Sequence, residues 1–192
     1  LEVVQMCGII GYTGYRAAAP ILLEGLSKLE YRGYDGAGIA VMSQSGETAV
    51  GKSRGKLSAL VESLGDTLPE GTNGIGPTRW STQGGPTDEN AHPHTDCKGE
   101  VAVVHNGIVE NFVDLRRELE DQGHVFASET DSECIPHLIE SYMQDEHPLE
   151  EAARLTAGRI RGAHAVVAAS RRDPGKLVGF RLGNAGGIVI GY

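Results

Sequence analysis

A cysteine directly follows a methionine near the start of the chain, at Met6-Cys7. If the chain began at this cysteine, one residue would carry a thiol of pKa about 8.5 and an α-amine of pKa about 7.7 to 8.0. The amine would then be the base for the adjacent nucleophile, as in N-terminal threonine hydrolases. The alternative is a small buried residue that opens a strand, because free cysteine is among the most buried residue types. The residues around Cys7 alone favour the second interpretation.

Two later segments place polar side chains at the ends of apolar or glycine-rich runs. Thr78-Arg79-Trp80 contains the only tryptophan, and the apolar run 101–104 leads directly into His105-Asn106-Gly107. We interpret each segment as a strand that ends in a functional loop, with glycine allowing close approach of backbone to a ligand.

Two further candidates have simpler explanations. His92 and His94, in Asn90-Ala91-His92-Pro93-His94, indicate a metal only weakly, since no carboxylate or thiolate stands at helical spacing from them. Structural hydrogen bonding is the better interpretation of this pair. Asp131 precedes an expected helix, where the helix dipole favours a carboxylate. Taken alone, Asp131 is a helix-start residue.

Composition narrows the class of ligand. Seventeen Lys and Arg against 26 Asp and Glu give a formal charge of −9 without a basic run, so nucleic acid and anionic lipid are poor partners. Cys7, Cys97 and Cys134 are an odd number without metal-type spacing, which argues against disulfides and a zinc site and favours a reducing cytoplasm. No apolar run approaches a membrane span of roughly 20 residues, and residues 1–5 lack the features of a signal peptide. We expect a small-molecule ligand, no cofactor and no metal.

The elements that must position these residues follow from hydrophobic periodicity. The pattern predicts one domain of the α+β class, with largely antiparallel sheets and helices stacked outside. Residues 31–38 are glycine-rich and predict an irregular loop. The expected strands are 7–12, 39–42, 49–52, 101–104, 165–169, 177–181 and 187–190, and the expected helices are 17–30, 56–64, 109–122, 133–143 and 149–160.

Together the motifs resemble the glutaminase domains of the glutamine–fructose-6-phosphate aminotransferases. The matching pieces are Met6-Cys7-Gly8-Ile9, Leu29-Glu30-Tyr31-Arg32-Gly33-Tyr34-Asp35, Thr78-Arg79-Trp80, Asn90-Ala91-His92-Pro93-His94, Val104-His105-Asn106-Gly107 and Ser128-Glu129-Thr130-Asp131. The resemblance implies a class II glutamine amidotransferase of the N-terminal-nucleophile hydrolase superfamily. Its fold would be an αββα sandwich of two antiparallel sheets between helical layers.

The resemblance also implies catalytic roles. Cys7 would attack the side-chain amide of L-glutamine, with its own amine as base, and a thioester would follow. The side-chain amide of Asn106 and the backbone N–H of Gly107 would form the oxyanion hole. His105 is a candidate supporting residue and the first alternative base.

The binding roles fall on a second set of residues. Arg79 would clamp the α-carboxylate of glutamine through its planar guanidinium, and Asp131 would accept the α-ammonium group. Trp80 and Thr82 would belong to a loop that closes over the substrate, with Gln83 beside them. For Arg32 an orienting role near Cys7 and a structural ion pair remain equal alternatives.

Three departures from the family pattern affect these expectations. Residues 1–6 precede Cys7, so we expect an upstream extension of 1–6, and a chain that keeps it should be inactive because an amide nitrogen is no base. Gln83 stands where the family commonly has histidine. The domain at 7–192 should be incomplete at its C-terminus and lack the isomerase domain, as a fragment or a shortened homologue.

The remaining alternatives differ in class. One is the glutaminase domain of another class II amidotransferase, such as the one that serves phosphoribosyl pyrophosphate. Another is a non-catalytic glutamine-binding module, which would keep Arg79 and Asp131 but need no cysteine amine. In the leading interpretation, fructose 6-phosphate is a partner only through the isomerase domain, and the full-length protein is a homo-oligomer.

Overall fold

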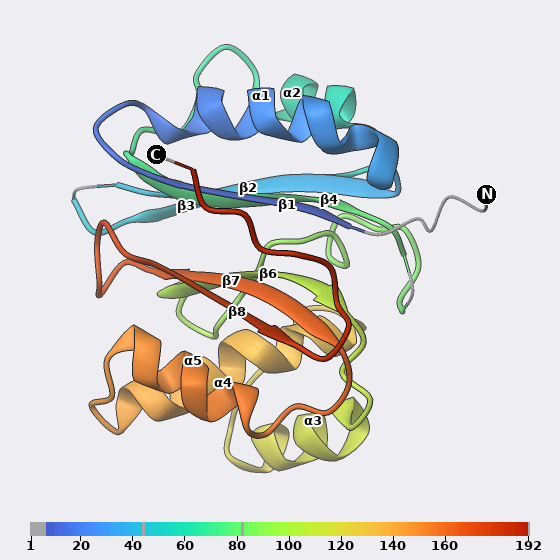
Figure 1. Ribbon diagram of the computed structural model, residues 1–192, viewed down its shortest axis with the longest axis vertical. Helices are drawn as coiled ribbons and strands as arrows, with labels where there is room; N and C mark the ends of the chain where they lie inside the picture. The colour runs from blue at the N-terminus through green and yellow to red at the C-terminus, as the bar shows by residue number, and fades with distance from the viewer. Residues whose placement is uncertain (1–6, 44, 82, 192) are drawn as a thin grey trace.

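Four antiparallel strands from the first half of the chain form one sheet, in the order β1-β4-β2-β3. The computed structural model describes residues 7–43, 45–81 and 83–191. The strands of this sheet are β1 (Gly8–Thr13), β2 (Gly36–Met42), β3 (Thr48–Arg54) and β4 (Asn73–Arg79). Helices α1 (Ala18–Leu29) and α2 (Leu57–Leu64) cover its outer face (Figure 1). Leu22 and Leu26 stand four residues apart in α1 and are both buried, so the apolar stripe of the helix faces the sheet.

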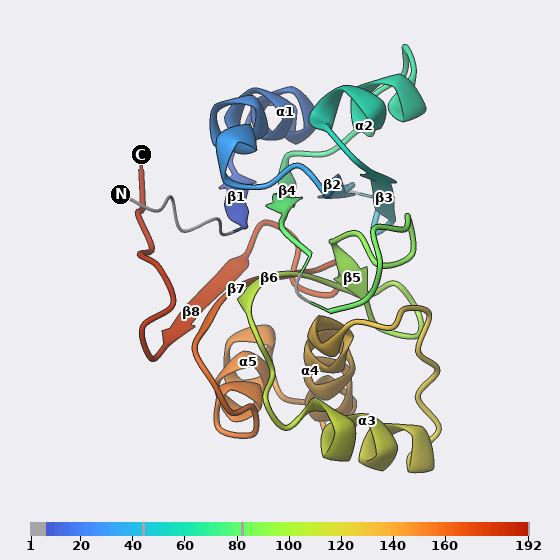
Figure 2. The same cartoon turned by 90° about the vertical axis from the view of Figure 1, so that its right-hand side faces the viewer.

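The second sheet has the order β5-β6-β7-β8 and is also antiparallel. Its strands are β5 (His94–Thr95), β6 (Val101–Gly107), β7 (His164–Ser170) and β8 (Leu177–Leu182). Helices α4 (Cys134–Gln144) and α5 (Leu149–Ala157) cover the outer face of this sheet, and α3 (Phe112–Asp121) packs against α4 on the side away from the sheet (Figure 2). Short 3₁₀ helices at Glu30–Arg32 (η1) and Asp131–Glu133 (η2) precede β2 and α4.

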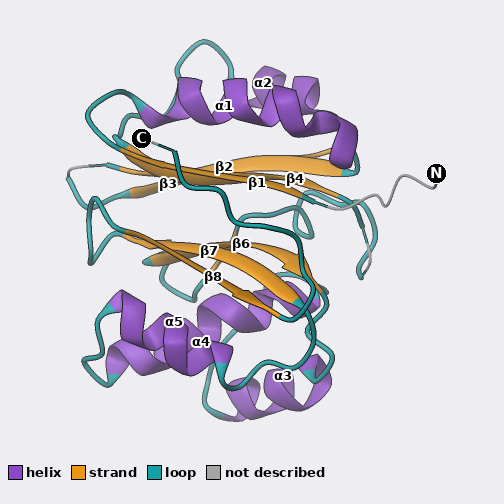
Figure 3. Cartoon of the chain, viewed as in Figure 1, coloured by secondary structure: helices purple, strands orange, loops and turns teal. Residues whose placement is uncertain are grey.

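The two sheets pack face to face, which gives four layers in the order helix, sheet, sheet, helix (Figure 3). Ala40, Met42 and Ile75 from the first sheet meet Ala102, Val104 and Ala169 from the second. Every residue of β2 is buried, because one face contacts the other sheet and the opposite face contacts the helices. The predicted α+β fold with two antiparallel sheets between helical layers is confirmed.

Strand register brings the chemically interesting segments to one end of the sandwich. β1 pairs antiparallel with β4, with Gly8 opposite Thr78, so Cys7 lies beside the end of β4 at Arg79. In the other sheet Gly107 ends β6 and is opposite His164 at the start of β7. None of the helices in the described ranges is long and apolar enough to cross a bilayer.

Two sequence expectations about the elements were wrong. Residues 187–190, predicted to be a strand, pair with no strand in the described part of the chain, and Val189 is 95% exposed. The segment therefore follows β8 without joining an edge of either sheet. The predicted loop at 31–38 ends early, since Gly36 to Gly38 already belong to β2. At Gly38 a Cβ atom would lie 2.1 Å from the backbone oxygen of His92, so this glycine permits close packing inside a strand.

The predicted helices exist, with shifted ends. The helix expected from Val109 begins at Phe112. Val109 is instead held outside the helix by a hydrogen bond of 2.6 Å from its N–H to the Asp131 carboxylate. The last predicted helix ends at Ala157 rather than at Ile160.

Candidate active site

A pocket of about 200 Å³ opens between the two sheets at the end where β1 begins and β4 and β6 end. This volume suits one small molecule. The residues that line it are Cys7, Arg79, Trp80, Gln83, His92, His105, Asn106, Gly107, Ile108, Thr130, Asp131 and Ser132. One pocket therefore contains five residues that we expected to act together, although they span 125 positions of the sequence. They are Cys7, Arg79, Asn106, Gly107 and Asp131.

The thiol of Cys7 lies against the backbone of Trp80. The Trp80 N–H donates to the sulfur at 3.4 Å, and the thiol faces the Trp80 carbonyl oxygen at 3.8 Å. Burial raises the pKa of the Cys7 thiol, while the Trp80 hydrogen bond and the charges of Arg79 and Arg32 act in the opposite direction. Cys7 thus combines a desolvated sulfur with nearby cations, an environment that suits a nucleophile once the thiol loses its proton.

The guanidinium of Arg79 is buried at the end of β4, with the residue 2% exposed. It donates to three backbone oxygens of the next loop, at 2.6 Å to Gln83 and 3.3 Å to both Gly84 and Gly85. Among the described residues no carboxylate forms an ion pair with it. Burial lowers the pKa of Arg79, and an anion in the pocket would offset that desolvation cost.

Asn106 and Gly107 form the end of β6 beside the same pocket. Gly107 has φ of +147°, and a Cβ atom there would lie 2.1 Å from the Ala163 carbonyl oxygen. Both the backbone conformation and the lack of space require glycine. This arrangement places the Asn106 amide and the Gly107 backbone in the wall of the pocket.

Asp131 begins η2, in front of α4, and is 2% exposed. One of its oxygens accepts the Val109 N–H at 2.6 Å. Burial raises the pKa of Asp131, and hydrogen bonds from Val109 and from the backbone of η2 act against that shift. The carboxylate is therefore a desolvated acceptor that a cationic group in the pocket would stabilise.

A chain of buried polar side chains supports the floor of the pocket. His105 Nδ1 is 2.7 Å from Ser132 Oγ, and His105 Nε2 is 3.0 Å from His164 Nδ1. Burial holds the pKa of His105 well below its usual range, so the ring is neutral. His105 lies at the predicted site but is a weak base there.

The other sequence candidates lie around this core. Trp80 and Gln83 line the pocket, and the Trp80 ring meets Tyr34 edge to face at 5.5 Å. Arg32 ends η1, and in the described ranges no carboxylate pairs with it, so the structural ion pair is not present there. Thr82 lies outside the described residues.

His92, Ile108, Thr130 and Ser132 line the pocket but were not predicted as site residues. Their neighbours in sequence offered a signal, because Ile108 follows Gly107 and Asp131 separates Thr130 from Ser132. His94 donates to or accepts from Thr130 Oγ1 at 2.9 Å, as expected for structural hydrogen bonding. Burial lowers the pKa of His92 to about 3, so this ring is also neutral.

Comparison with known proteins places these residues in a family context. The family model for a glutamine amidotransferase domain matches residues 79–181. Glutamine–fructose-6-phosphate aminotransferase (isomerizing) from Symbiobacterium thermophilum is 53% identical over 187 residues, 97% of this chain and 30% of the relative. The enzyme of that name from Pyrococcus horikoshii is 51% identical over 90% of this chain and 29% of the relative. The chain thus spans about 30% of the length of these curated relatives.

A solved structure shares the fold at lower identity. Glutamine phosphoribosylpyrophosphate amidotransferase from B. subtilis, complexed with ADP and GMP, superimposes with a TM-score of 0.68 at 28% identity, covering 86% of this chain and 35% of that one. The identity to the two fructose-6-phosphate aminotransferases is almost twice as high.

Proposed function

The chain belongs to the glutamine amidotransferase domain family, and we propose that it performs the glutaminase half-reaction of a glutamine–fructose-6-phosphate aminotransferase. In this reaction the side-chain amide of L-glutamine is hydrolysed to glutamate and ammonia. The observation that carries the proposal is one pocket that holds a buried thiol, a strand-end amide, a buried carboxylate and a guanidinium that has no ion-pair partner among the described residues. Hydrolysis of an amino-acid amide requires each of these groups.

Cys7 is the proposed nucleophile. In a chain that begins at Cys7, the thiol gives its proton to the α-amine and the thiolate attacks the amide carbon. When the tetrahedral intermediate collapses, the ammonium form of the amine protonates its NH₂ group, the C–N bond breaks to release ammonia, and a thioester remains. A water molecule, deprotonated by the same amine, then attacks the thioester to release glutamate and restore the thiol.

The negative charge that develops on the amide oxygen needs donors that are already in position. We assign this role to the side-chain NH₂ of Asn106 and the backbone N–H of Gly107, which are adjacent at the end of β6. Losing one such donor costs on the order of 3 kcal/mol of transition-state stabilisation.

Recognition of the amino-acid end falls on Arg79 and Asp131, two desolvated groups of opposite charge in one pocket. Arg79 would clamp the α-carboxylate and Asp131 would accept the α-ammonium group, so a zwitterion satisfies both. Trp80, with Thr82 and Gln83, would cover the substrate. Arg32, whose charge lowers the pKa of the Cys7 thiol, would support the nucleophile.

The ammonia would serve fructose 6-phosphate in a further domain of a longer protein, as the names and lengths of the relatives suggest. We propose that this longer protein is cytoplasmic and homo-oligomeric. A glutaminase domain that serves phosphoribosyl pyrophosphate is the second candidate, and the lower identity to that enzyme disfavours it. A purely glutamine-binding module would not need the Cys7 thiol or the two oxyanion donors.

The test compares two forms of the chain. One keeps residues 1–6, and the other begins at Cys7. Glutamate release is measured for both at pH 7 to 8, with the N-terminus of each verified by mass spectrometry. We expect turnover only from the version that begins at Cys7, since an amide nitrogen at Cys7 has no free electron pair to accept a proton. Alkylation of Cys7 by a glutamine-like electrophile should still occur slowly in the longer form.

Two results would contradict the proposal in different ways. Comparable turnover by both forms would remove the α-amine as the base and direct attention to His105. If the form that begins at Cys7 bound glutamine but released no glutamate, the chain would be a binding module.

A further inference from the structure

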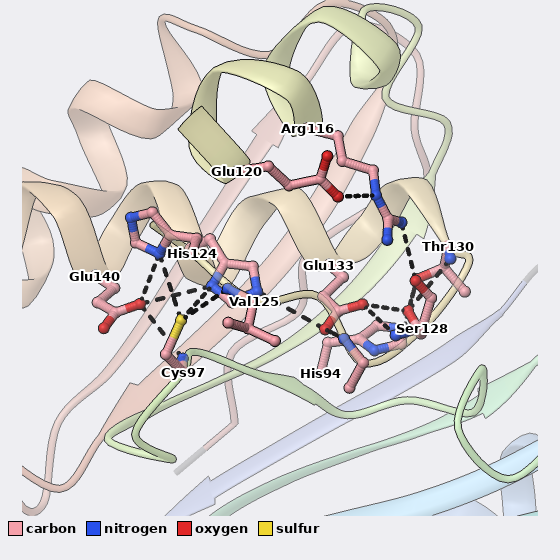
Figure 4. A network of polar contacts seen from close by, with 12 residues as sticks. His94, Cys97, Arg116, Glu120, His124, Val125, Ser128, Thr130, Glu133 and Glu140 are labelled. Atoms are coloured by element: carbon pink, nitrogen blue, oxygen red, sulfur yellow. Dashed lines mark hydrogen bonds and ion pairs between the residues drawn. The ribbon is translucent and has the colours of Figure 1, made fainter. Parts of the chain in front are cut away.

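Four metal-ligating side chains meet outside the pocket, on the opposite side of the second sheet from the sandwich interior. They are Cys97 from the β5–β6 loop, His124 from the segment after α3, and His137 and Glu140 from α4. One donor atom of each lies within 4.8 Å of the others. Figure 4 shows Cys97, His124 and Glu140 directed toward one another. None of the four lines the candidate active site.

We propose that this cluster, named the Cys97 cluster below, binds one zinc ion. A tetrahedral ion with Zn–S of about 2.3 Å and Zn–N of about 2.0 to 2.1 Å separates its sulfur and nitrogen ligands by roughly 3.6 Å. Cys97 Sγ is 3.6 Å from Nδ1 of both His124 and His137. Glu140 Oε2 is 3.0 Å from His124 Nδ1 and 3.6 Å from His137 Nδ1. These four distances are close to those between the ligands of a tetrahedral zinc ion, and all four donor atoms lie within 4.8 Å of one another.

The hydrogen bonds of His124 indicate which ring nitrogen faces the cluster with a lone pair. Ser141 Oγ donates its single proton to the His137 carbonyl oxygen at 3.1 Å. The Ser141 oxygen must therefore accept from His124 Nε2, which is 3.0 Å away. In a neutral ring this leaves Nδ1 unprotonated. Nδ1 faces Glu140 Oε2 at 3.0 Å, so its lone pair and the carboxylate can bind a cation held between the two groups.

His137 has a similar outer partner. Its Nε2 lies 3.7 Å from Glu133 Oε1 and makes no hydrogen bond in the described part of the chain, while its Nδ1 faces the cluster. Backbone N–H groups of Ala127 and Ser128 hold the Glu133 carboxylate at 2.7 Å each. A carboxylate behind a histidine ligand orients the ring and strengthens the nitrogen that binds metal.

Charge balance also favours a divalent cation. The Cys97 N–H donates to Glu140 Oε2 at 3.3 Å, which directs the carboxylate toward the cluster. Zinc would displace the thiol proton into water, and one thiolate plus one carboxylate would neutralise the 2+ ion.

Four protein ligands leave no open position, so the ion would be structural. It would tie the β5–β6 loop and the segment after α3 to α4, whose start directly follows Asp131 and η2. The Val125 N–H, 3.4 Å from Cys97 Sγ, would stabilise the bound thiolate. Cys97 is exposed, which provides a path for the ion. This proposal is independent of the proposed glutaminase function.

The test begins with zinc content. The chain is incubated with zinc, dialysed, and analysed by plasma mass spectrometry, alongside Cys97→Ala and Glu140→Gln. Cys7→Ala and Glu62→Gln are the matched controls, since Cys7 lies in the pocket and Glu62 is an exposed residue of α2. We expect one zinc per chain in the parent and controls. The affinity for zinc should fall at least about 100-fold in Cys97→Ala and Glu140→Gln, because losing a residue that only hydrogen-bonds to a metal ligand already costs about 10- to 100-fold.

A second measurement needs no variant. Co²⁺ added to the parent chain should produce the visible bands of a tetrahedral site and a thiolate-to-cobalt charge-transfer band. Zinc should also protect Cys97 from alkylation, and a chelator should remove that protection. Absence of bound zinc and of the charge-transfer band in the parent would overturn the proposal, as would equal zinc binding by the parent, Cys97→Ala and Glu140→Gln.

Discussion

The candidate active site and the Cys97 cluster are both centred on a thiol, but the charges around the two thiols have opposite signs. Burial raises the pKa of both. Arg79 and Arg32 partly offset this effect at Cys7, whereas Glu140 and Asp96 add to it at Cys97. The protein itself supplies the positive charge that favours a thiolate at Cys7. At Cys97 that charge must come from an external cation.

The histidines differ in the same way. His92, His94 and His105 are buried near the pocket, and burial lowers the pKa of all three. His124 and His137 instead face the carboxylate of Glu140. Neutral rings near the pocket can support a site by hydrogen bonding without adding charge. Rings beside a carboxylate and a thiol are suited to hold a metal.

The largest expected effect is the difference in glutamine turnover between a variant that lacks the Cys7 thiol and one that lacks the Cys97 thiol. In a chain that begins at Cys7, Cys7→Ala should lower glutamine turnover at least about 1,000-fold, as removal of a covalent nucleophile does. Cys97→Ala should lower turnover far less, because this thiol contacts no part of the pocket. Glutamate release at saturating glutamine measures both. If Cys7→Ala and Cys97→Ala lowered glutamate release equally, the assignment of Cys7 as the nucleophile would be wrong.

A second prediction divides the roles within the pocket. Asn106→Ala should lower kcat by about 100- to 1,000-fold with little change in KM, because the amide acts on charge that develops in the transition state. Arg79→Lys should mainly raise KM, since the guanidinium acts on a carboxylate remote from the scissile bond. Steady-state kinetics of both variants provide the measurement. If both changed KM alone, the oxyanion role of Asn106 would be wrong.

The smallest expected effect concerns pH. A thiol reacts only as the thiolate, so below a raised pKa the alkylation rate should increase about tenfold per pH unit. We expect this slope between pH 6 and 8 for Cys7, and also for Cys97 in the chelated protein. With zinc bound, labelling of Cys97 should be slow and nearly independent of pH. Iodoacetamide labelling followed by peptide mass spectrometry distinguishes the sites, and identical slopes with and without zinc would contradict metal ligation by Cys97.

Much of the fold and of the pocket follows from local sequence. Apolar periodicity predicted the α+β class and all five helices, because an amphipathic element is encoded within a few consecutive turns. Short motifs also identified residues of the pocket, including Arg79, Asn106 and Asp131, since each motif keeps its own strand or helix end together. The resemblance to a known family then linked those motifs to one reaction.

Other features depended on contacts between distant segments. The strand predicted at 187–190 needs a neighbouring strand to pair with, and no local pattern reveals whether the chain brings it to one. Likewise, the argument against zinc considered spacing along the chain, whereas Cys97, His124 and Glu140 come from a loop, a connecting segment and a helix. Sequence determined which side chains were present and which element carried each one. Only packing of α4 against the second sheet decided that these donors meet within a few ångströms, because that distance is set by tertiary contacts and not by the separation of residues in the chain.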